Sequence, residues 1–308
     1  MIATEGLAHS VHTRLIAKAK EQGIEAQLLL ERYALHRFLF RLSESSHADR
    51  FLLKGAQLML IWMGESARTT RDADLLGFGE ITDAELGRII TEICEEPVVD
   101  DGMEYLPDSI RITPIREETA YGGRRVKFQA RLGNARLPIQ IDVGIGDAVS
   151  PEPRWVELPQ MLDLPAPRLR AYRPETSIAE KLETMVMRGL INSRLKDYFD
   201  IHVLSAHETF DLQTLADAIR STFERRGTLV PPGLPEGLTQ AYVDEPGRAL
   251  QWRAFLEKSG AANIRDELGS IVEAMATFLE PAIAVARGEE IGARRWRPGG
   301  PWQSKEAE

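Results

Sequence analysis

Cysteine and long apolar runs are almost absent from this chain of 308 residues. Cys94 is its one cysteine, so no disulfide can form within the chain. This composition is typical of a reducing compartment, most simply the cytoplasm. No window approaches about 18 uninterrupted apolar residues, and the N-terminus lacks the apolar core of a signal peptide. We therefore expect no membrane span.

An excess of positive charge is missing as well. The chain has 38 lysines and arginines against 47 aspartates and glutamates, a net charge of −9. A protein that binds nucleic acid through bulk charge would be basic, so a polyanionic partner must meet a local basic patch. The candidates are Arg124, Arg125 and Lys127; Arg194 and Lys196; and Arg294, Arg295, Trp296 and Arg297.

Each of these basic stretches can also be a solvated surface. The tryptophan of the last stretch, Trp296, could stack on an unpaired base. For this stretch, however, we favour a loose tail.

The order of sequence patterns predicts an α/β protein. Periodicity predicts a helix over 28–42, a strand over 51–53, a helix after Gly55 and a strand in "DADLLGF". An amphipathic helix over 81–96, capped by Thr82 or Asp83, precedes three strand-length segments that read as a β-meander. Proline density between 151 and 167 places a domain boundary near 155, and the region 156–308 reads as mostly helical.

Two aspartates stand two residues apart in the segment "RTTRDADLLGF". On a strand, Asp72 and Asp74 would point to the same face. Adjacent carboxylates do not both stay ionised cheaply unless a cation lies between them, and Mg²⁺ prefers oxygen ligands. Asp142, on the alternating strand "IQIDVGIGD", would complete a three-carboxylate site if its strand lay beside them. The alternative is that Asp72 and Asp74 face solvent at a sheet edge.

Two lysines are candidates for phosphate contact. Lys54 and Gly55 stand where a strand turns into a helix, and the amides of a helix N-terminus favour phosphate. Ser177 and Glu180 have the spacing of a capping box, which would place Lys181 on the first turn of a helix, within reach of a triphosphate. A plain turn and a solvated surface lysine are the alternatives.

In combination, these segments resemble the nucleotidyltransferase toxins of the AbiEii/AbiGii group, which includes abortive-infection and tRNA-modifying toxins. "RTTRDADLL" matches an R-x-T-x-D-x-D-L signature through Arg68, Thr70, Asp72, Asp74 and Leu75. "AEK", then an arginine, then "KDYFD" match a second pattern through the residues Ala179, Glu180, Lys181, Arg188, Lys196, Asp197 and Asp200. The likeness spans roughly residues 28–205. It departs at Ala56, where many members have a second glycine.

The resemblance implies a polymerase-β-like nucleotidyltransferase core, a mixed sheet with flanking helices, over 1–155. It also implies a mostly helical C-terminal region, 156–308, that contributes Lys181 and Asp197 to the site. Asp72 and Asp74 would bind Mg²⁺ or Mn²⁺, and an aspartate of "KDYFD" would be essential; we assign that role to Asp197, with Asp200 as the fallback. The catalytic set would then be Asp72, Asp74, Asp142, Lys181 and Asp197. The nucleotide-binding set would be Lys54, Gly55, Arg68, Thr70 and Lys181.

The expected reaction is transfer of NMP from an NTP to an acceptor, with pyrophosphate leaving. The tRNA-modifying relatives suggest the tRNA 3′ end as acceptor, and the toxin resemblance implies a cognate antitoxin encoded nearby. Transfer to a protein side chain stays open, since its chemistry at the metal would be the same. A catalytically inactive binding module on the same fold is the third possibility.

Overall fold

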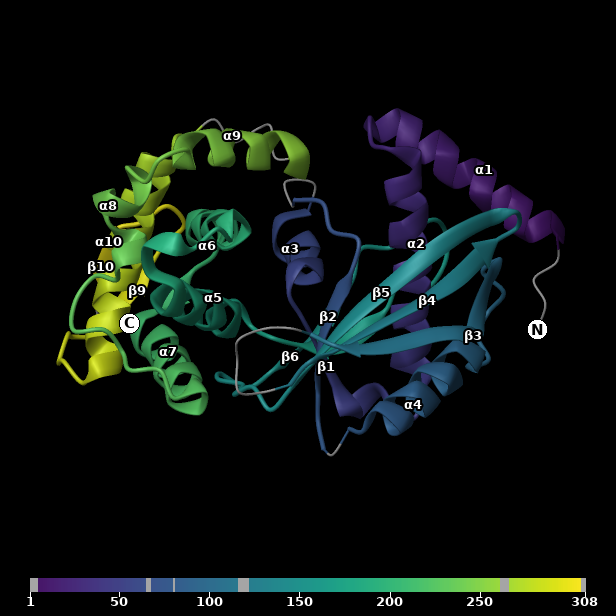
Figure 1. Ribbon diagram of the computed structural model, residues 1–308, viewed down its shortest axis with the longest axis horizontal. Coiled ribbons are helices and arrows are strands. Elements are labelled where there is room, and N and C mark those ends of the chain that lie inside the picture. Colours follow the sequence, from purple (N-terminus) through teal and green to yellow (C-terminus); the bar gives the residue numbers. More distant parts are fainter. Residues whose placement is uncertain (1–4, 65–67, 80, 116–121, 261–265, 306–308) are drawn as a thin grey trace. The chain divides into compact units, whose positions relative to one another are not determined.

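The computed structural model describes residues 5–64, 68–79, 81–115, 122–260 and 266–305. The chain divides into two compact units (Figure 1). Unit 1 comprises 1–61, 70–146 and 154–171, and unit 2 comprises 62–69, 147–153 and 172–308. Two short segments of unit 2 therefore interrupt unit 1 in the sequence, and one of them ends inside the "RTTRDADLL" signature, at Thr69.

Unit 1 is built on a mixed sheet of seven strands in the order β3-β4-β5-β2-β1-β7-β6. The strands are β1 (Phe51–Lys54), β2 (Ala73–Gly77), β3 (Met103–Pro114), β4 (Arg124–Leu132), β5 (Ala135–Ile145), β6 (Arg154–Glu157) and β7 (Arg168–Ala171). β2 is parallel to β5 and β1 to β7, whereas the other neighbours are antiparallel. The expected α/β class with a mixed sheet is confirmed.

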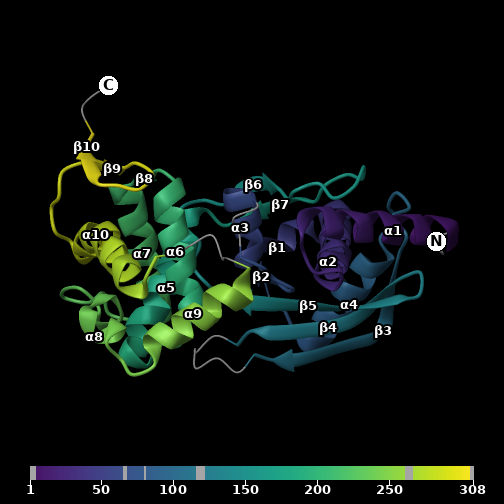
Figure 2. The same cartoon turned by 90° about the horizontal axis from the view of Figure 1, so that it is seen from above.

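Helices cover one face of the β3–β5 part of this sheet. They are α1 (Glu5–Gln22), α2 (Ala26–Glu44) and α4 (Asp83–Glu95), which lie together on the same side in Figure 2. Phe38 of α2 packs on Phe128 of β4, with ring centroids 5.2 Å apart. Because side chains alternate along a strand, Arg125, Lys127 and Gln129 point to the opposite face. We call it the helix-free face, because no described helix of unit 1 covers it in Figure 2.

Local signals place several of these elements where they were expected. Thr82 caps α4 by accepting a hydrogen bond from the amide of Glu85. β1 is followed directly by Gly55 and by α3 (Ala56–Met63), and a short 3-10 helix η1 (Ala48–Arg50) precedes it. The strand-then-helix turn at Lys54–Gly55 is therefore confirmed.

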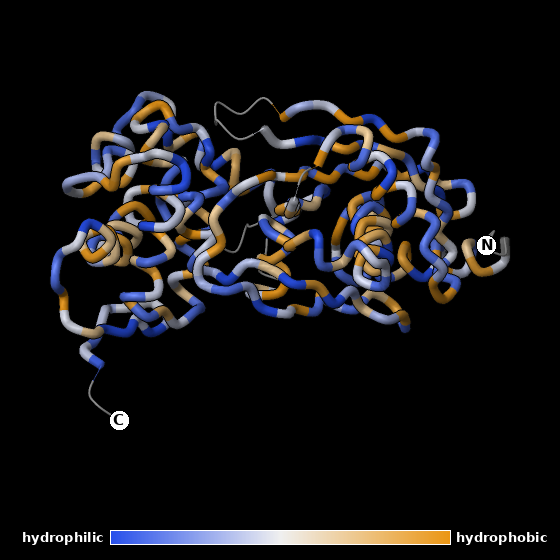
Figure 3. Tube along the Cα trace, turned by 90° about the horizontal axis from the view of Figure 1, so that it is seen from below, coloured by the Kyte–Doolittle hydropathy of each residue, from blue (hydrophilic) through white to orange (hydrophobic). Residues whose placement is uncertain are grey.

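Unit 2 is mostly helical. It contains α5 (Pro174–Arg188), α6 (Leu195–His207), α7 (Leu212–Arg226), α8 (Gln240–Val243), α9 (Arg248–Ser259) and α10 (Leu268–Arg287), with 3-10 turns η3 (Gly189–Ile191) and η4 (Glu236–Leu238). A small antiparallel sheet adds β8 (Phe210–Asp211), β9 (Arg294–Trp296) and β10 (Trp302–Ser304). Figure 3 shows apolar residues recurring along the helices and strands of both units.

α10 is the longest described helix of unit 2 and is partly buried. Within the described residues, it is the one helix long and apolar enough to cross a membrane, but 56% of its most apolar window is buried. It packs against α6 and α7, and its Phe278 contacts Phe210 and Trp296 at centroid distances of 5.1 and 4.9 Å. Its apolar length is thus explained by its place in the core.

Two local expectations were wrong. α5 begins at Pro174, so Ser177 lies inside the helix and does not cap it; Pro174 at the first helical position is itself a favoured start. Lys181 is consequently the eighth residue of α5 and not part of its first turn. The tail expected to be loose forms the β9–β10 hairpin, whose Trp296 is 4% exposed and donates from Nε1 to the Ser205 carbonyl. This buried indole does not present a face for base stacking.

Candidate active site

Asp74 lies in the middle of the unit 1 sheet, between two neighbouring strands. Its register partner on β1 is Lys54 and its partner on β5 is Asp142. The strand carrying Asp142 therefore lies beside the strand carrying Asp74, which is the arrangement that a three-carboxylate site would need. Asp72 occupies a bend just before β2, so it is adjacent to the strand and not part of it.

Four charged side chains form a row across β1, β2, β5 and β4. Lys54 pairs with Asp74, Asp74 with Asp142, and Asp142 with Arg125 in register. Register partners point to the same face of a sheet, which here is the face opposite α2. The row therefore alternates as cation, carboxylate, carboxylate, cation, and all four residues are half-buried.

Arg125 and Asp142 form a two-pronged ion pair. Nε of Arg125 donates to Oδ1 of Asp142 at 2.8 Å and its second nitrogen donates to Oδ2 at 2.6 Å. These hydrogen bonds, together with the charges of Asp142, Asp72 and Asp74, raise the pKa of Arg125 against the opposing effect of burial. Arg125 is thus close enough to feel all three carboxylates, a role that the sequence reasoning missed.

Asp72 is held from both its side chain and its backbone. Its carboxylate accepts the Thr70 hydroxyl at 2.8 Å and lies 3.4 Å from the amide nitrogen of Gln140, which is also 3.4 Å from Asp142. Its carbonyl accepts a hydrogen bond of 2.9 Å from Gln57, whose side-chain oxygen meets His36 Nε2 at 3.2 Å. Gln57 is fully buried, so this contact fixes where the bend before β2 begins.

Gly55 provides space for the Asp74 carboxylate. It has φ +71°, and the three atoms that a side-chain Cβ would meet first all belong to Asp74. Any larger residue would therefore have to displace that carboxylate. The glycine of the Lys-Gly turn serves the aspartate site directly, whereas contact with phosphate stays a prediction.

A second charged cluster lies within unit 2. Arg68 donates to both oxygens of Asp200 at 2.8 and 3.0 Å, and Lys181 Nζ donates to Asp200 at 2.8 Å and to Asp197 at 3.1 Å. Arg194 completes the cluster with a 2.7 Å bond to Asp197. In these contacts three cations, Arg68, Lys181 and Arg194, face two carboxylates.

Burial strengthens the interactions between the charged groups of this cluster. Both aspartates are 0% exposed. Burial alone would raise the pKa of Asp197, but the charges of Lys181 and Arg194 lower it to about 2. The pKa of Asp200 is lowered as well, by Lys181 and Arg68 against the effect of burial. Lys181 is therefore not a surface lysine, and both aspartates hold it in place, so the geometry does not single out Asp197 over Asp200.

The aspartate pair fits a hard divalent ion. Mg²⁺ is commonly bound through one or two carboxylates together with substrate phosphates. Asp72 and Asp74 supply that donor type. Asp72 accepts hydrogen bonds from the neutral side chains of Thr70 and Gln140, and both oxygens of Asp142 accept from the charged guanidinium of Arg125. Among the described residues, no group of three or more His, Cys, Asp or Glu is arranged to hold a metal.

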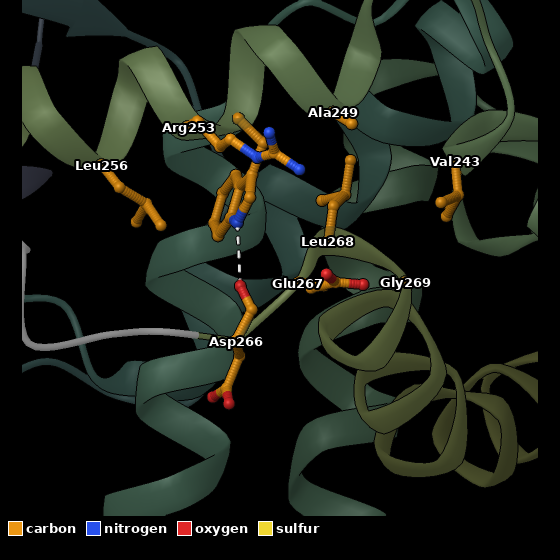
Figure 4. Close-up of a pocket in the computed structure, with 9 residues that line it drawn as sticks. Val243, Ala249, Arg253, Leu256, Asp266, Glu267, Leu268 and Gly269 are labelled. Atoms are coloured by element: carbon orange, nitrogen blue, oxygen red, sulfur yellow. Dashed lines mark hydrogen bonds between the residues drawn. The ribbon is translucent and has the colours of Figure 1, made fainter.

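A pocket of about 240 Å³ lies elsewhere in unit 2 (Figure 4). Trp252 Nε1 donates to the Asp266 carbonyl at 3.1 Å across it. It contains none of the residues predicted for the site. Its lining residues are Val243, Ala249, Trp252, Arg253, Leu256, Asp266, Glu267, Leu268 and Gly269.

The sequence of residues 37–276 matches the family model described as "Nucleotidyl transferase AbiEii toxin, Type IV TA system". The chain belongs to the AbiEii family. It is thus a nucleotidyltransferase of a toxin group whose systems pair a toxin with an antitoxin. The match includes every predicted site residue of both clusters. No curated protein matches the sequence.

Solved structures similar to this AbiEii chain include two from Helicobacter pylori, a putative nucleotidyltransferase and JHP933. Both are 17% identical to this chain, match 83% of it and have a TM-score of 0.45. The match covers 97% of the putative nucleotidyltransferase and 94% of JHP933. MenT4, a nucleotidyltransferase toxin from Mycobacterium tuberculosis H37Rv, is 16% identical over 91% of this chain and 99% of its own, with a TM-score of 0.46.

Proposed function

We propose that this AbiEii protein transfers NMP from an NTP to the 3′ end of a tRNA in a metal-dependent reaction. An acceptor hydroxyl oxygen forms the new bond to the α-phosphorus, the bond to the pyrophosphate oxygen breaks, and the hydroxyl proton passes to water. The observation that carries the proposal is the pair Asp72 and Asp74: the carboxylate of Asp74 lies against Gly55, and both aspartates act on the charge of Arg125. Mg²⁺ or Mn²⁺ would supply charge neutralisation at the phosphates.

The nucleotide-binding roles are proposed for Lys54, Gly55, Arg68, Thr70 and Lys181. Thr70 hydrogen-bonds Asp72, so its contribution is to orient that carboxylate. Arg68 and Lys181 are cations held in fixed positions by Asp200, and a cation fixed in this way suits an anionic ligand. Asp197 and Asp200 then act as positioning residues, because each contacts Lys181 and an arginine.

The helix-free face of the sheet supports a nucleic-acid acceptor over a protein side chain. Arg111 pairs with Lys127 and Arg131 with Arg136 in register, so these four cations share the face that carries Arg125. Lys127 and Arg136 are exposed. Arg131 and Arg125 are paired with Glu104 and Asp142, whereas no ion pair joins Lys127 or Arg136 to an acidic residue among the described residues. In a chain of net charge −9, this face thus offers cations to which a phosphate backbone could bind.

A labelled-nucleotide transfer assay tests the proposed reaction. Each of the four NTPs is incubated with Mg²⁺, purified tRNA and cell protein, and label is followed into each acceptor. We expect label in tRNA with the wild type, and none with Asp72→Ala or Asp74→Ala. Asp108→Ala, an exposed aspartate on β3, serves as the control and should keep full activity.

The outcomes separate the alternatives. Label in protein alone would replace tRNA by a protein side chain as acceptor. No transfer to either, together with no binding of Mg²⁺–NTP, would indicate an inactive binding module. Full turnover by the Asp72 or Asp74 variant would refute the metal assignment.

The acceptor surface has its own test. Lys127→Gln and Arg136→Gln should weaken tRNA binding and each reduce the slope of log affinity against log salt by about 0.7–0.9. Lys20→Gln on α1 is the control, because it is an exposed lysine away from the helix-free face. We further propose that the protein acts in the cytoplasm and is neutralised by a cognate antitoxin.

A further inference from the structure

The ion pair between Arg125 and Asp142 has a consequence for the metal centre. Both oxygens of Asp142 accept hydrogen bonds from one guanidinium, at 2.8 and 2.6 Å. A guanidinium stays protonated in proteins and its fork matches a carboxylate in two-pronged geometry. A divalent ion and Arg125 therefore compete for the same oxygens.

The position of Asp142 makes that competition relevant. It is the register partner of Asp74 on the adjacent strand, and Gln140 lies 3.4 Å from both Asp142 and Asp72. An unpaired Asp142 carboxylate would thus stand beside the two aspartates of the proposed metal site. Arg125 itself is 38% exposed on its side chain, so packing does not lock it to Asp142.

We propose that Arg125 keeps Asp142 out of the metal centre, and that Asp142 becomes a metal ligand only when this ion pair breaks. The resting centre then has two metal-binding carboxylates, Asp72 and Asp74. The affinity of a carboxylate site for a hard cation depends on its ligand charge count, so the pair sets a low resting affinity. This inference rests on the proposed metal-dependent function.

Direct metal binding tests it without any turnover. Mn²⁺ is titrated into the full chain without nucleotide, and free Mn²⁺ is measured by electron paramagnetic resonance. We expect Arg125→Gln to bind Mn²⁺ about tenfold more tightly than the wild type, because a third carboxylate joins the site. Arg125→Lys, which keeps the charge but not the fork, should fall between them.

A matched control and a double-mutant cycle separate ligand release from simple charge removal. Arg124→Gln is the matched control, because it removes the same charge at the preceding residue. Arg124 pairs with Asp83 and points to the other face of the sheet, so this substitution should leave the Mn²⁺ affinity nearly unchanged. In an Asp142→Asn background, Arg125→Gln should lose most of its tenfold gain. Thermal unfolding checks that every variant is folded.

A gain of the same size in both backgrounds would show that only charge matters, and would overturn the inference. The inference would also be overturned if Arg125→Gln bound Mn²⁺ no more tightly than the wild type, while Mn²⁺ binding by the wild type still depended on Asp72 and Asp74. Failure of the proposed function looks different: Mn²⁺ binding is then unaffected by Asp72→Asn and Asp74→Asn, and nucleotide transfer survives both.

Discussion

The side chain of Asp74 occupies the space that a Cβ at position 55 would need, so only a glycine fits at Gly55. A Cβ on Gly55 would lie within 2.6 Å of the Asp74 carboxyl carbon and 2.8 Å of its Cβ. The same glycine has φ +71°, a conformation that costs L-residues roughly 1–2 kcal/mol. The turn after β1 and the aspartate on β2 are therefore coupled through one position.

Gly55→Ala should for this reason impair function more than stability. We expect a loss of about 1–3 kcal/mol in the free energy of unfolding, from backbone strain and the displaced carboxylate. Nucleotide transfer should fall at least tenfold, because Asp74 moves. Urea unfolding and the transfer assay measure the two effects.

The control for this prediction is Gly133→Ala. Gly133 also has a positive φ, +58°, but a Cβ there would meet only Ala8 at an ordinary 3.9 Å. It should lose stability to backbone strain while keeping transfer activity. Equal activity losses in the two variants would contradict a specific role for Gly55.

His36 makes the fold sensitive to mild acid. Burial lowers the pKa of His36 to about 4, from an ordinary value near 6.5. Between these values the unfolded chain takes up a proton that the folded chain excludes, so the free energy of unfolding falls as pH drops from 6.5 to 4. This loss in the free energy of unfolding is on the order of 3 kcal/mol. Above pH 6.5 His36 causes no such loss.

His36→Gln tests that linkage. Unfolding by urea at pH 7 and pH 4.5 should show a smaller difference for the variant than for the wild type, by about 2–3 kcal/mol. His9→Gln, at an exposed histidine of α1, should leave the difference unchanged. A variant with the wild-type pH dependence would show that His36 does not carry the effect.

Local patterns were sufficient to predict most elements of the fold. The helix around 28–42 and the capped helix at Thr82 depend on residues close in sequence, and both were confirmed. The predicted start of α5 was wrong, because Pro174 and the Ser177–Glu180 spacing are competing signals for a helix start. The helix begins at the proline. The β9–β10 hairpin was missed because Trp296 is buried by Phe278 and Ser205, far away in the sequence.

The residues of the candidate site could be named from the sequence, but their pairings could not. The two-residue spacing of Asp72 and Asp74 and the alternation around Asp142 are visible in the sequence. Strand register is set by long-range pairing, so nothing local showed that Arg125 would face Asp142. Likewise, the ion pair between Arg68 and Asp200 joins residues 132 positions apart.

Lys181→Ala should destabilise the protein as well as weaken nucleotide binding. The substitution removes one of three cations from two buried carboxylates, which costs about 3–5 kcal/mol for a broken buried pair. We expect the lower end, because Arg68 and Arg194 still neutralise Asp200 and Asp197. Urea unfolding at pH 7 measures this cost.

Nucleotide affinity and turnover of Lys181→Ala are then measured well below its unfolding temperature. Loss of one charge-assisted contact should weaken both by about ten- to a hundredfold, or roughly 1.5–3 kcal/mol. Lys258→Ala, at an exposed lysine on α9, is the control for stability and binding. If Lys181→Ala unfolds early yet binds NTP normally when folded, Lys181 is a structural cation only.

Expression of the protein alone should slow bacterial growth, and an antitoxin encoded beside it should relieve the effect. Growth arrest has to depend on catalysis, because blocking a tRNA 3′ end prevents aminoacylation, whereas binding alone would sequester only as many tRNAs as there are protein molecules. The decisive comparison is therefore wild type against the Asp72→Ala, Asp74→Ala double variant at equal protein levels. We expect arrest with the first and normal growth with the second. Equal arrest by both would mean that toxicity comes from binding, and the inactive-module alternative would replace nucleotide transfer as its cause.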